Sequence, residues 1–123
     1  MGGEERRRGI RTSTQLVALV KHLATGKVRR WLTKNLSGVG VCLVADESLE
    51  RGTRLEVEVT LPDYPTPLAV MGEVVWLMTV QPAHKSYEVP KVELGVRFID
   101  PPQKTQSLLD AYARMTALPA DLP

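Results

Sequence analysis

The stretch Arg-Leu-Glu-Val-Glu-Val-Thr-Leu, residues 54–61, alternates strictly between polar and apolar side chains. Successive side chains of a β-strand point to opposite faces, so this pattern predicts a strand with one buried face and one face in water. Leu55, Val57, Val59 and Leu61 form the face expected to be buried. A half-buried strand of this kind is typical of an antiparallel sheet, so the stretch predicts a strand of such a sheet.

Further strands are expected on both sides of this stretch, because runs of β-forming residues alternate with glycine, proline and polar turn residues. Gly72 is interpreted as a bulge or bend, and Trp76 as a cap on the core. The segment 62–67 is not expected to continue a strand, since its three prolines lack a backbone N–H. The predicted strands are Gln15–His22, Val28–Lys34, Val39–Ala45, Arg54–Leu61, Leu68–Met78 and Lys91–Ile99.

Apolar residues recur with helical spacing after the last predicted strand, at Leu108, Leu109, Tyr112 and Met115, behind a pair of prolines. Gln103–Leu118 is therefore predicted to be a helix that closes one end of the sheet. Six strands with short connections favour a closed antiparallel β-barrel, because closure removes the exposed strand edges.

The chain of 123 residues has the length of a single domain. We expect three parts within it, a flexible arginine-rich arm at 1–14, the barrel at 15–100 and the C-terminal helix at 101–118. The sequence shows neither an apolar run long enough to span a membrane nor a secretory signal, so a cytoplasmic location without membrane association is expected. The single Cys42 permits no internal disulfide, and its apolar surroundings favour a buried, inert thiol.

Basic residues are concentrated toward the N-terminus. Residues 1–34 contain nine Lys or Arg against two Glu, a net charge of +7, whereas residues 35–123 carry −5. This asymmetry suggests an anionic partner for the N-terminal third of the chain. The segment Glu5–Arg11 holds four arginines, whose planar guanidinium groups match phosphate oxygens and the O6/N7 edge of guanine.

A second polar stretch, Thr33–Leu43, places Asn35, Ser37, Gly38 and Gly40 between apolar runs. Short polar side chains such as these bond the backbone of a turn or a ligand held against it. Glycine permits positive φ or the close approach of another segment. The stretch is therefore predicted to form a sharp turn, a binding loop, or both.

Together the two polar stretches resemble the paired signatures of the PilZ domain family. Arg7 and Arg11 fit the pattern Arg-x-x-x-Arg, and Asn35, Ser37 and Gly40 fit (Asp or Asn)-x-Ser-x-x-Gly. The resemblance extends over nearly the whole chain. It implies a six-stranded, PilZ-like split barrel and a bacterial receptor for the second messenger cyclic di-GMP.

The resemblance also implies roles for these residues. Arg7 and Arg11 are expected to contact phosphate and guanine of cyclic di-GMP. Asn35 and Ser37 are expected to bond the other guanine and to fix the loop, and Gly40 to let the backbone come close to the ligand.

Arg6, Arg8 and Gly38 are secondary candidates for ligand binding. Arg6 occupies a place that in the family influences whether one or two stacked nucleotides are held. Val39 stands where many family members have glycine, so Gly38 is expected to supply the backbone freedom that a β-branched residue lacks. Arg97, in a stretch similar to the last strand of the family, is expected to have a structural role.

The mechanism implied is that the arm folds onto the barrel when cyclic di-GMP bridges arm and loop, and that a downstream protein partner then senses the changed surface. Neither a cofactor nor a metal site is expected, since His22 and His84 are far apart in the sequence. Ser13 and Ser37 have no nearby base, and the chain is therefore not expected to be an enzyme.

Two other functions remain open at this point. One is a degenerate PilZ adaptor that binds a protein partner without the nucleotide. The other is a small β-barrel nucleic-acid binder that uses the basic N-terminal region. A nucleic-acid binder requires stacking aromatic side chains, yet aromatic residues make up only 5% of the chain and Trp31 alone lies near the basic segment.

Overall fold

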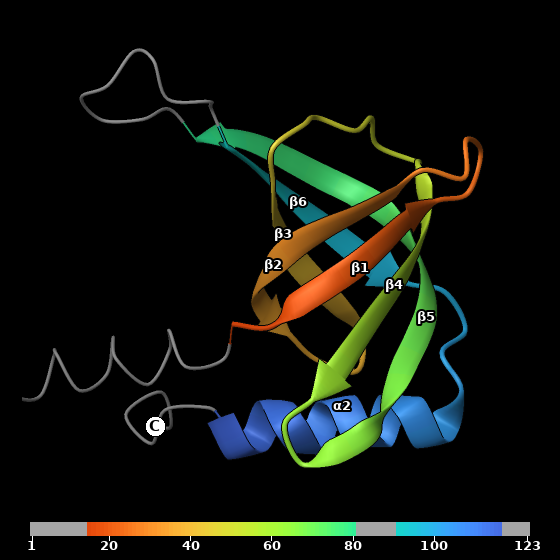
Figure 1. Ribbon diagram of the computed structural model, residues 1–123, viewed down its shortest axis with the longest axis vertical. Coiled ribbons are helices and arrows are strands. Elements are labelled where there is room, and N and C mark those ends of the chain that lie inside the picture. Colours follow the sequence, from red (N-terminus) through yellow and green to blue (C-terminus); the bar gives the residue numbers. More distant parts are fainter. Residues whose placement is uncertain (1–14, 81–90, 117–123) are drawn as a thin grey trace, which may run out of the picture.

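The computed structural model describes residues 15–80 and 91–116 (Figure 1). Six strands close into an antiparallel barrel in the order β1-β2-β3-β6-β5-β4, so that each strand has a neighbour on both sides. The expected fold class is confirmed, whereas the expected arm, residues 1–14, lies outside the described residues. The elements are β1 (Val17–His22), β2 (Val28–Leu36), β3 (Gly40–Ala45), β4 (Arg54–Leu61), β5 (Tyr64–Val80), β6 (Lys91–Phe98) and α2 (Gln103–Thr116).

The alternating stretch forms β4 with the predicted bounds and the predicted buried face. Its apolar side chains Leu55, Val57, Val59 and Leu61 are all buried, and β4 pairs with β1 on one side and with β5 on the other. Burying each such side chain contributes about 1.5–3 kcal/mol to folding. Inward-facing residues of the other strands complete one continuous core.

Strand β5 begins earlier than predicted, at Tyr64, and it includes Pro65 and Pro67. The pairing with β4 explains how the prolines are accommodated. Leu61 pairs with Tyr64 and Val59 with Leu68, so the three residues between them on β5 oppose a single residue of β4. In such a bulge the missing N–H groups interrupt no ladder hydrogen bond. The prediction that residues 62–67 interrupt the strands therefore holds for the turn at 62–63 and was wrong for 64–67.

A second bulge in β5 changes the direction of its side chains. The strand passes from β4 to β6 at Gly72, which pairs with residues of both neighbours. The extra residue of the bulge is not Gly72 but Val75, because Val74 pairs with Val96 and Trp76 with Gly95. A one-residue shift moves the following side chains to the opposite face.

Helix α2 lies across one end of the barrel, at the bottom of Figure 1. It follows the two prolines as predicted, and Leu109 and Tyr112 pack into the core, whereas Met115 is exposed. The last two residues of the predicted helix lie outside the described residues. Within residues 15–80 and 91–116, no helical segment has the length and apolar character needed to cross a membrane.

Candidate ligand-binding site

The β2–β3 turn, residues 37–40, is held by short hydrogen bonds of its own. Ser37 N donates to Gly40 O at 3.0 Å, and Val39 N donates to Ser37 Oγ at 3.2 Å. Asn35 precedes the turn on β2, where a register shift against β3 marks a bulge. Its side chain is exposed and has no hydrogen-bond partner among the described residues, so its amide is free for a ligand.

Gly38 connects this turn to helix α2. Its backbone N–H donates to Asp110 Oδ1 at 2.7 Å, and a Cβ at this position would lie 2.6 Å from the same carboxylate. Within the described residues, the glycines with positive φ are Gly26 and Gly52, and Val39 also has an ordinary backbone conformation. The expectation that Gly38 supplies positive φ was therefore wrong, because the position needs glycine for space against α2.

Gly40 is required for the close approach of β3 to β6. A Cβ at Gly40 would lie 2.5 Å from the carbonyl oxygen of Val96, which is too close for any real side chain. The backbone at the start of β3 thus lies directly against β6, and the turn is held against the barrel wall.

Asn35, Ser37 and Gly40 line one pocket of about 400 Å³ on the outside of the barrel. We call it the Trp76 pocket, because Trp76 forms part of its wall together with Arg97 from β6. The structure thus brings together all three residues that the sequence assigned to the loop half of the site. The complete lining is Asn35, Ser37, Val39, Gly40, Val41, Cys42, Val75, Trp76, Gly95, Val96 and Arg97.

Trp76 faces outward, and its predicted role as a cap on the core was wrong. Its side chain is 43% exposed. The bulge at Val75 places it opposite Gly95 instead of beside the inward-facing residues, and a Cβ at Gly95 would lie only 2.1 Å from the indole Nε1. The ring therefore rests on the bare backbone of β6, and this gives the pocket an aromatic side chain on which a base can stack.

Arg97 supplies a cation to the same pocket. Its Nη2 donates to Glu73 Oε1 at 3.3 Å, and Arg54 Nε lies 3.8 Å from that same oxygen. One carboxylate thus faces two guanidinium groups, and Arg97 is 63% exposed. Exposed ion pairs of this kind contribute little to stability, so Arg97 can turn toward an anion at small cost. Arg97 thus contacts a neighbouring strand through Glu73, and its place in the pocket also makes it a candidate ligand-binding residue.

Two further groups near the site, Lys34 and Cys42, are not available to bind or react with a ligand. Lys34 pairs with Glu93 at 3.0 Å, and the hydrogen bond and charge of Glu93 raise the pKa of the Lys34 ammonium. Cys42 is 4% exposed, as expected, and its burial raises the pKa of the thiol. A neutral, buried thiol is a poor nucleophile, so Cys42 forms an inert part of the wall.

The arginines of the predicted site, Arg6, Arg7, Arg8 and Arg11, lie outside the described residues. The residues that sequence reasoning missed are Trp76 and Arg97. Their sequence signal was weak, because an aromatic and an arginine on strands are ordinary residues until the bulge and the pairing of β5 with β6 bring them beside Asn35.

The site contains hydrogen-bonding groups, an aromatic face and a guanidinium, but no group of His, Cys, Asp or Glu in residues 15–80 and 91–116 is placed to hold a metal ion. Fold and site together define a small β-barrel domain with an external pocket. The PilZ domain model matches residues 5–114, and the chain belongs to this family. That match includes the four arginines of the N-terminal segment. No curated protein matches the sequence.

Two solved structures share the fold. The PilZ domain with c-di-GMP of YcgR from Escherichia coli aligns with a TM-score of 0.64 and 15% identity, over 83% of this chain and 87% of that one. The inhibitor of motility MotI/DgrA from Bacillus subtilis aligns with a TM-score of 0.64 and 17% identity, over 82% of this chain and 46% of that one. At these identities the likeness establishes the fold.

Proposed function

We propose that this chain is a cytoplasmic receptor for cyclic di-GMP that passes the signal to a partner protein. The observation that carries the proposal is that Asn35, Ser37 and Gly40 line one pocket with Trp76 and Arg97, in a member of the PilZ family. Cyclic di-GMP carries two phosphates and two guanines, so a receptor needs cations, hydrogen-bonding groups and a stacking surface. The pocket and the N-terminal arginines contain all three.

In the proposed complex, each group has a distinct task. Asn35 offers both a donor and an acceptor to the edge of a guanine, and Ser37 fixes the turn through its bond to the Val39 N–H. Trp76 stacks on a base, an interaction worth about 1–3 kcal/mol for each base. Arg97 exchanges its contact with Glu73 for a phosphate oxygen, which is a stronger charge-assisted bond.

Arg7 and Arg11 complete the proposed site by the family resemblance, as the residues that clamp phosphate and guanine from the N-terminal arm. Folding the arm over the ligand costs about 1–2 kcal/mol for each residue ordered. The charge-assisted bonds of the two arginines offset this cost. The affinity for cyclic di-GMP therefore depends steeply on both arginines, and Arg6 and Arg8 contribute mainly through their charge.

The proposed signal has a second route besides the arm. The β2–β3 turn touches helix α2 through the bond from Gly38 N to Asp110 Oδ1. A ligand held by Ser37 and Gly40 on one side of this turn fixes its position, and the bond transmits that position to α2. The exposed face of α2 is therefore the surface on which a protein partner would sense the ligand.

The proposal is tested by isothermal titration calorimetry of cyclic di-GMP into the purified chain, with GTP as the control for specificity. Saturable binding of cyclic di-GMP alone, lost in the Arg7→Ala/Arg11→Ala variant, supports a receptor. Absence of heat up to about 1 mM ligand, where binding would be worth only about 4 kcal/mol, overturns the proposal. The alternative function, a degenerate PilZ adaptor that binds a protein partner without the nucleotide, would then be favoured.

The nucleic-acid alternative has less support, because Trp31, the aromatic residue near the basic segment in the sequence, is not accessible. Trp31 is 6% exposed, and its indole N–H donates to Asp46 Oδ1 at 3.0 Å. Titration of a fluorescent oligonucleotide at two salt concentrations tests this alternative, since phosphate-driven binding weakens steeply with salt.

A further inference from the structure

The barrel end opposite α2 contains a second pocket, of about 200 Å³. It lies where the turn between β1 and β2 faces the loop of residues 46–53, at the top of Figure 1. We call it the barrel-end pocket. Strand β2 separates it from the Trp76 pocket, because β2 begins here at Val28 and ends just before the β2–β3 turn. The two pockets share no lining residue.

The inner wall of the barrel-end pocket is apolar and rigid. Val20 and Leu55 are almost completely buried, and the Trp31 ring is held in place by the hydrogen bond to Asp46. Leu49, from the loop above, packs against the same core. An apolar body that enters the pocket therefore gains contacts without first having to order its walls.

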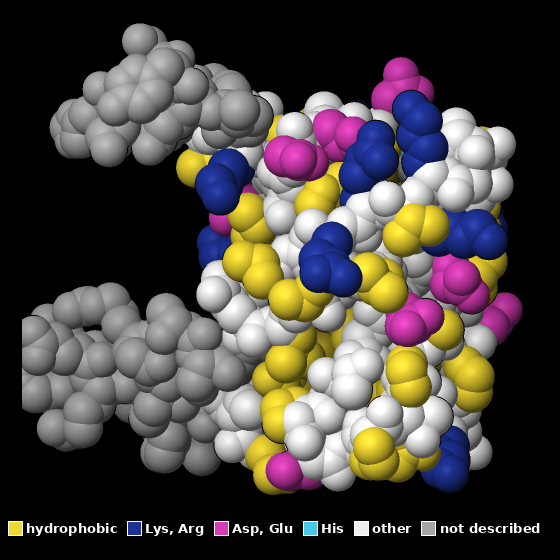
Figure 2. All heavy atoms as spheres, in the orientation of Figure 1, with side chains coloured by type: hydrophobic (Ala, Val, Ile, Leu, Met, Phe, Trp, Pro, Cys, Tyr) yellow, Lys and Arg dark blue, Asp and Glu magenta, His cyan; other side chains and the backbone are white. Residues whose placement is uncertain are grey.

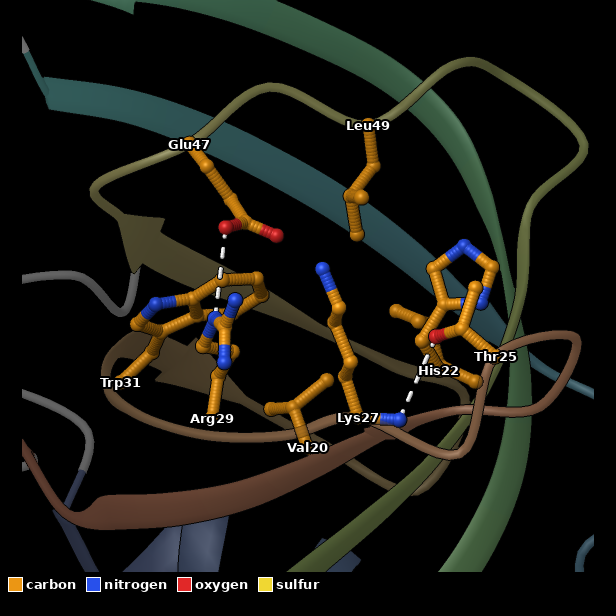
Figure 3. A pocket seen from close by; sticks show the side chains of 9 residues that line it. Val20, His22, Thr25, Lys27, Arg29, Trp31, Glu47 and Leu49 are labelled. Carbon is orange, nitrogen blue, oxygen red and sulfur yellow. Dashed lines mark hydrogen bonds and ion pairs between the residues drawn. The ribbon is translucent and has the colours of Figure 1, made fainter.

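The rim of the pocket is cationic. Figure 3 shows the Lys27 side chain extending beside Arg29 toward Leu49, with Glu47 close to Arg29. Glu47 accepts one bond from Arg29 Nε at 3.3 Å, which leaves the two terminal nitrogens of the guanidinium without a partner among the described residues. Lys27 forms no ion pair within residues 15–80 and 91–116.

The surface around this end carries charges of both signs. Figure 2 shows that Lys and Arg side chains on the visible face are concentrated in the half away from α2, with Asp and Glu side chains interspersed. A charged ligand is therefore recognised here by specific cations at the rim more than by a large uniform field.

His22 also borders this pocket. Its Nδ1 is buried and has no hydrogen-bond partner in the described part of the chain. A buried polar atom without a partner is costly and uncommon in native proteins, but an atom this inaccessible does not contact a ligand in the open pocket, so recognition there rests on the apolar wall and the cationic rim. Among the described residues, His22 is the only one with such an atom, and it lines this pocket.

We propose that the barrel-end pocket binds a small organic anion, a carboxylate or phosphate carried on a compact apolar body. The apolar body would lie against Val20, Leu55 and Trp31, and the anionic group would be held by Lys27 and the free nitrogens of Arg29. The volume of about 200 Å³ equals that of about seven waters, which accommodates a single ring with its charged group. Binding at this pocket is independent of the proposed cyclic di-GMP site.

The test uses the two tryptophans as separate reporters. Phenyl phosphate and benzoate are titrated into the ¹⁵N-labelled chain, and the indole N–H signals of Trp31 and Trp76 are followed by NMR. We expect a saturable shift of Trp31 with no shift of Trp76. Two controls each lack one part of the ligand: inorganic phosphate lacks the apolar ring, and benzyl alcohol lacks the charge. Both are expected to bind at least about ten-fold more weakly than phenyl phosphate and benzoate.

Two charge-removing variants locate the contact. Lys27→Met keeps the apolar stem but loses the ammonium, and it is expected to weaken binding of the better organic anion about five- to ten-fold. Arg30→Met is the matched control, because Arg30 follows Arg29 on β2 but does not line this pocket, and its effect is expected to be below about two-fold.

Three results would overturn the proposal. The first is an unmoved Trp31 signal with both organic anions up to about 10 mM, where any binding would be weaker than 3 kcal/mol. The second is equal binding of benzyl alcohol, and the third is an equal loss in the Lys27→Met and Arg30→Met variants.

Discussion

Trp31 and Trp76 lie on strands of the same barrel, yet they have opposite roles. Trp31 on β2 is 6% exposed and donates its N–H to Asp46, so it fills the core. Trp76 on β5 is 43% exposed and rests on the bare backbone of Gly95. The bulge at Val75 accounts for the position of Trp76, because without it Trp76 would continue the inward face of Val74. A single extra residue thus converts a core position into part of the proposed binding surface.

The difference between the two tryptophans is tested most strongly by removing each ring. Trp31→Ala is expected to lower the free energy of unfolding by about 3–5 kcal/mol, because it leaves a cavity in the core and an unpaired Asp46. Trp76→Ala is expected to cost less than about 1 kcal/mol, since its ring lies on the outer surface, is 43% exposed and leaves no cavity in the core. Urea denaturation followed by circular dichroism measures both. Similar losses in the two variants would contradict the assignment of Trp76 to the surface.

Substituting the two glycines of the β2–β3 turn tests how tightly this turn packs against β6 and α2. Gly40→Ala is expected to destabilise the fold by about 2–3 kcal/mol, because the new Cβ meets the Val96 backbone, which is held on both sides by strands. Gly38→Ala meets only the Asp110 side chain, which can rotate away, so about 1 kcal/mol is expected.

The control for this pair is the double variant Gly38→Ala/Asp110→Ala. It is expected to show a coupling, since removal of the Asp110 carboxylate also removes the clash. Purely additive losses in thermal or urea unfolding would show that Gly38 and Asp110 do not interact as described. The same double variant is expected to retain binding of cyclic di-GMP.

The proposed role of Trp76 in ligand binding is tested by removing its ring. Trp76→Ala is expected to weaken cyclic di-GMP binding about ten-fold in calorimetry, in line with the value of one stacked base. Gly95→Ala keeps the indole but displaces it, since its Cβ would overlap Nε1, and a smaller loss of about three- to five-fold is expected. Trp31→Phe serves as the control, with an affinity within about two-fold of the wild type. Unchanged binding in Trp76→Ala would exclude stacking.

The smallest expected effect concerns the wall behind the Trp76 pocket. Burial raises the pKa of Cys42 above its ordinary value of 9.0. The unfolded chain therefore releases the thiol proton first, and stability is lost as the pH rises above about 9 toward the folded pKa. We expect Cys42→Ala to reduce the fall in unfolding free energy between pH 8 and pH 10.5 by less than about 1 kcal/mol. An identical pH profile in the variant would contradict this reading.

The sequence predicted the barrel well because its strands follow a local rule. Alternation in β4 and helical spacing near Leu109 depend on near neighbours only, and both predictions were confirmed. The start of β5 was missed, because a bulge opposite β4 accommodates Pro65 and Pro67 and such pairing is not visible in one strand alone.

The grouping of residues at the candidate site was predicted in part for the same reason. Asn35, Ser37 and Gly40 are close in the chain and form a recognisable motif, and they do lie together. Trp76 and Arg97 reach them only through the pairing of β5 with β6, so no spacing in the sequence marks them. The role of Gly38 was missed because its neighbour, Asp110, lies on α2, far along the chain.

The assignment of the Trp76 pocket as the ligand site is tested most directly by an NMR titration of the ¹⁵N-labelled chain with cyclic di-GMP, observed at the two indole N–H signals. We predict a saturable shift of Trp76 with Trp31 unmoved, together with shifts of the Asn35 and Arg97 side-chain signals. Saturable binding that moves Trp31 and leaves Trp76 in place, or no change in either signal, would contradict the assignment of the Trp76 pocket as the ligand site.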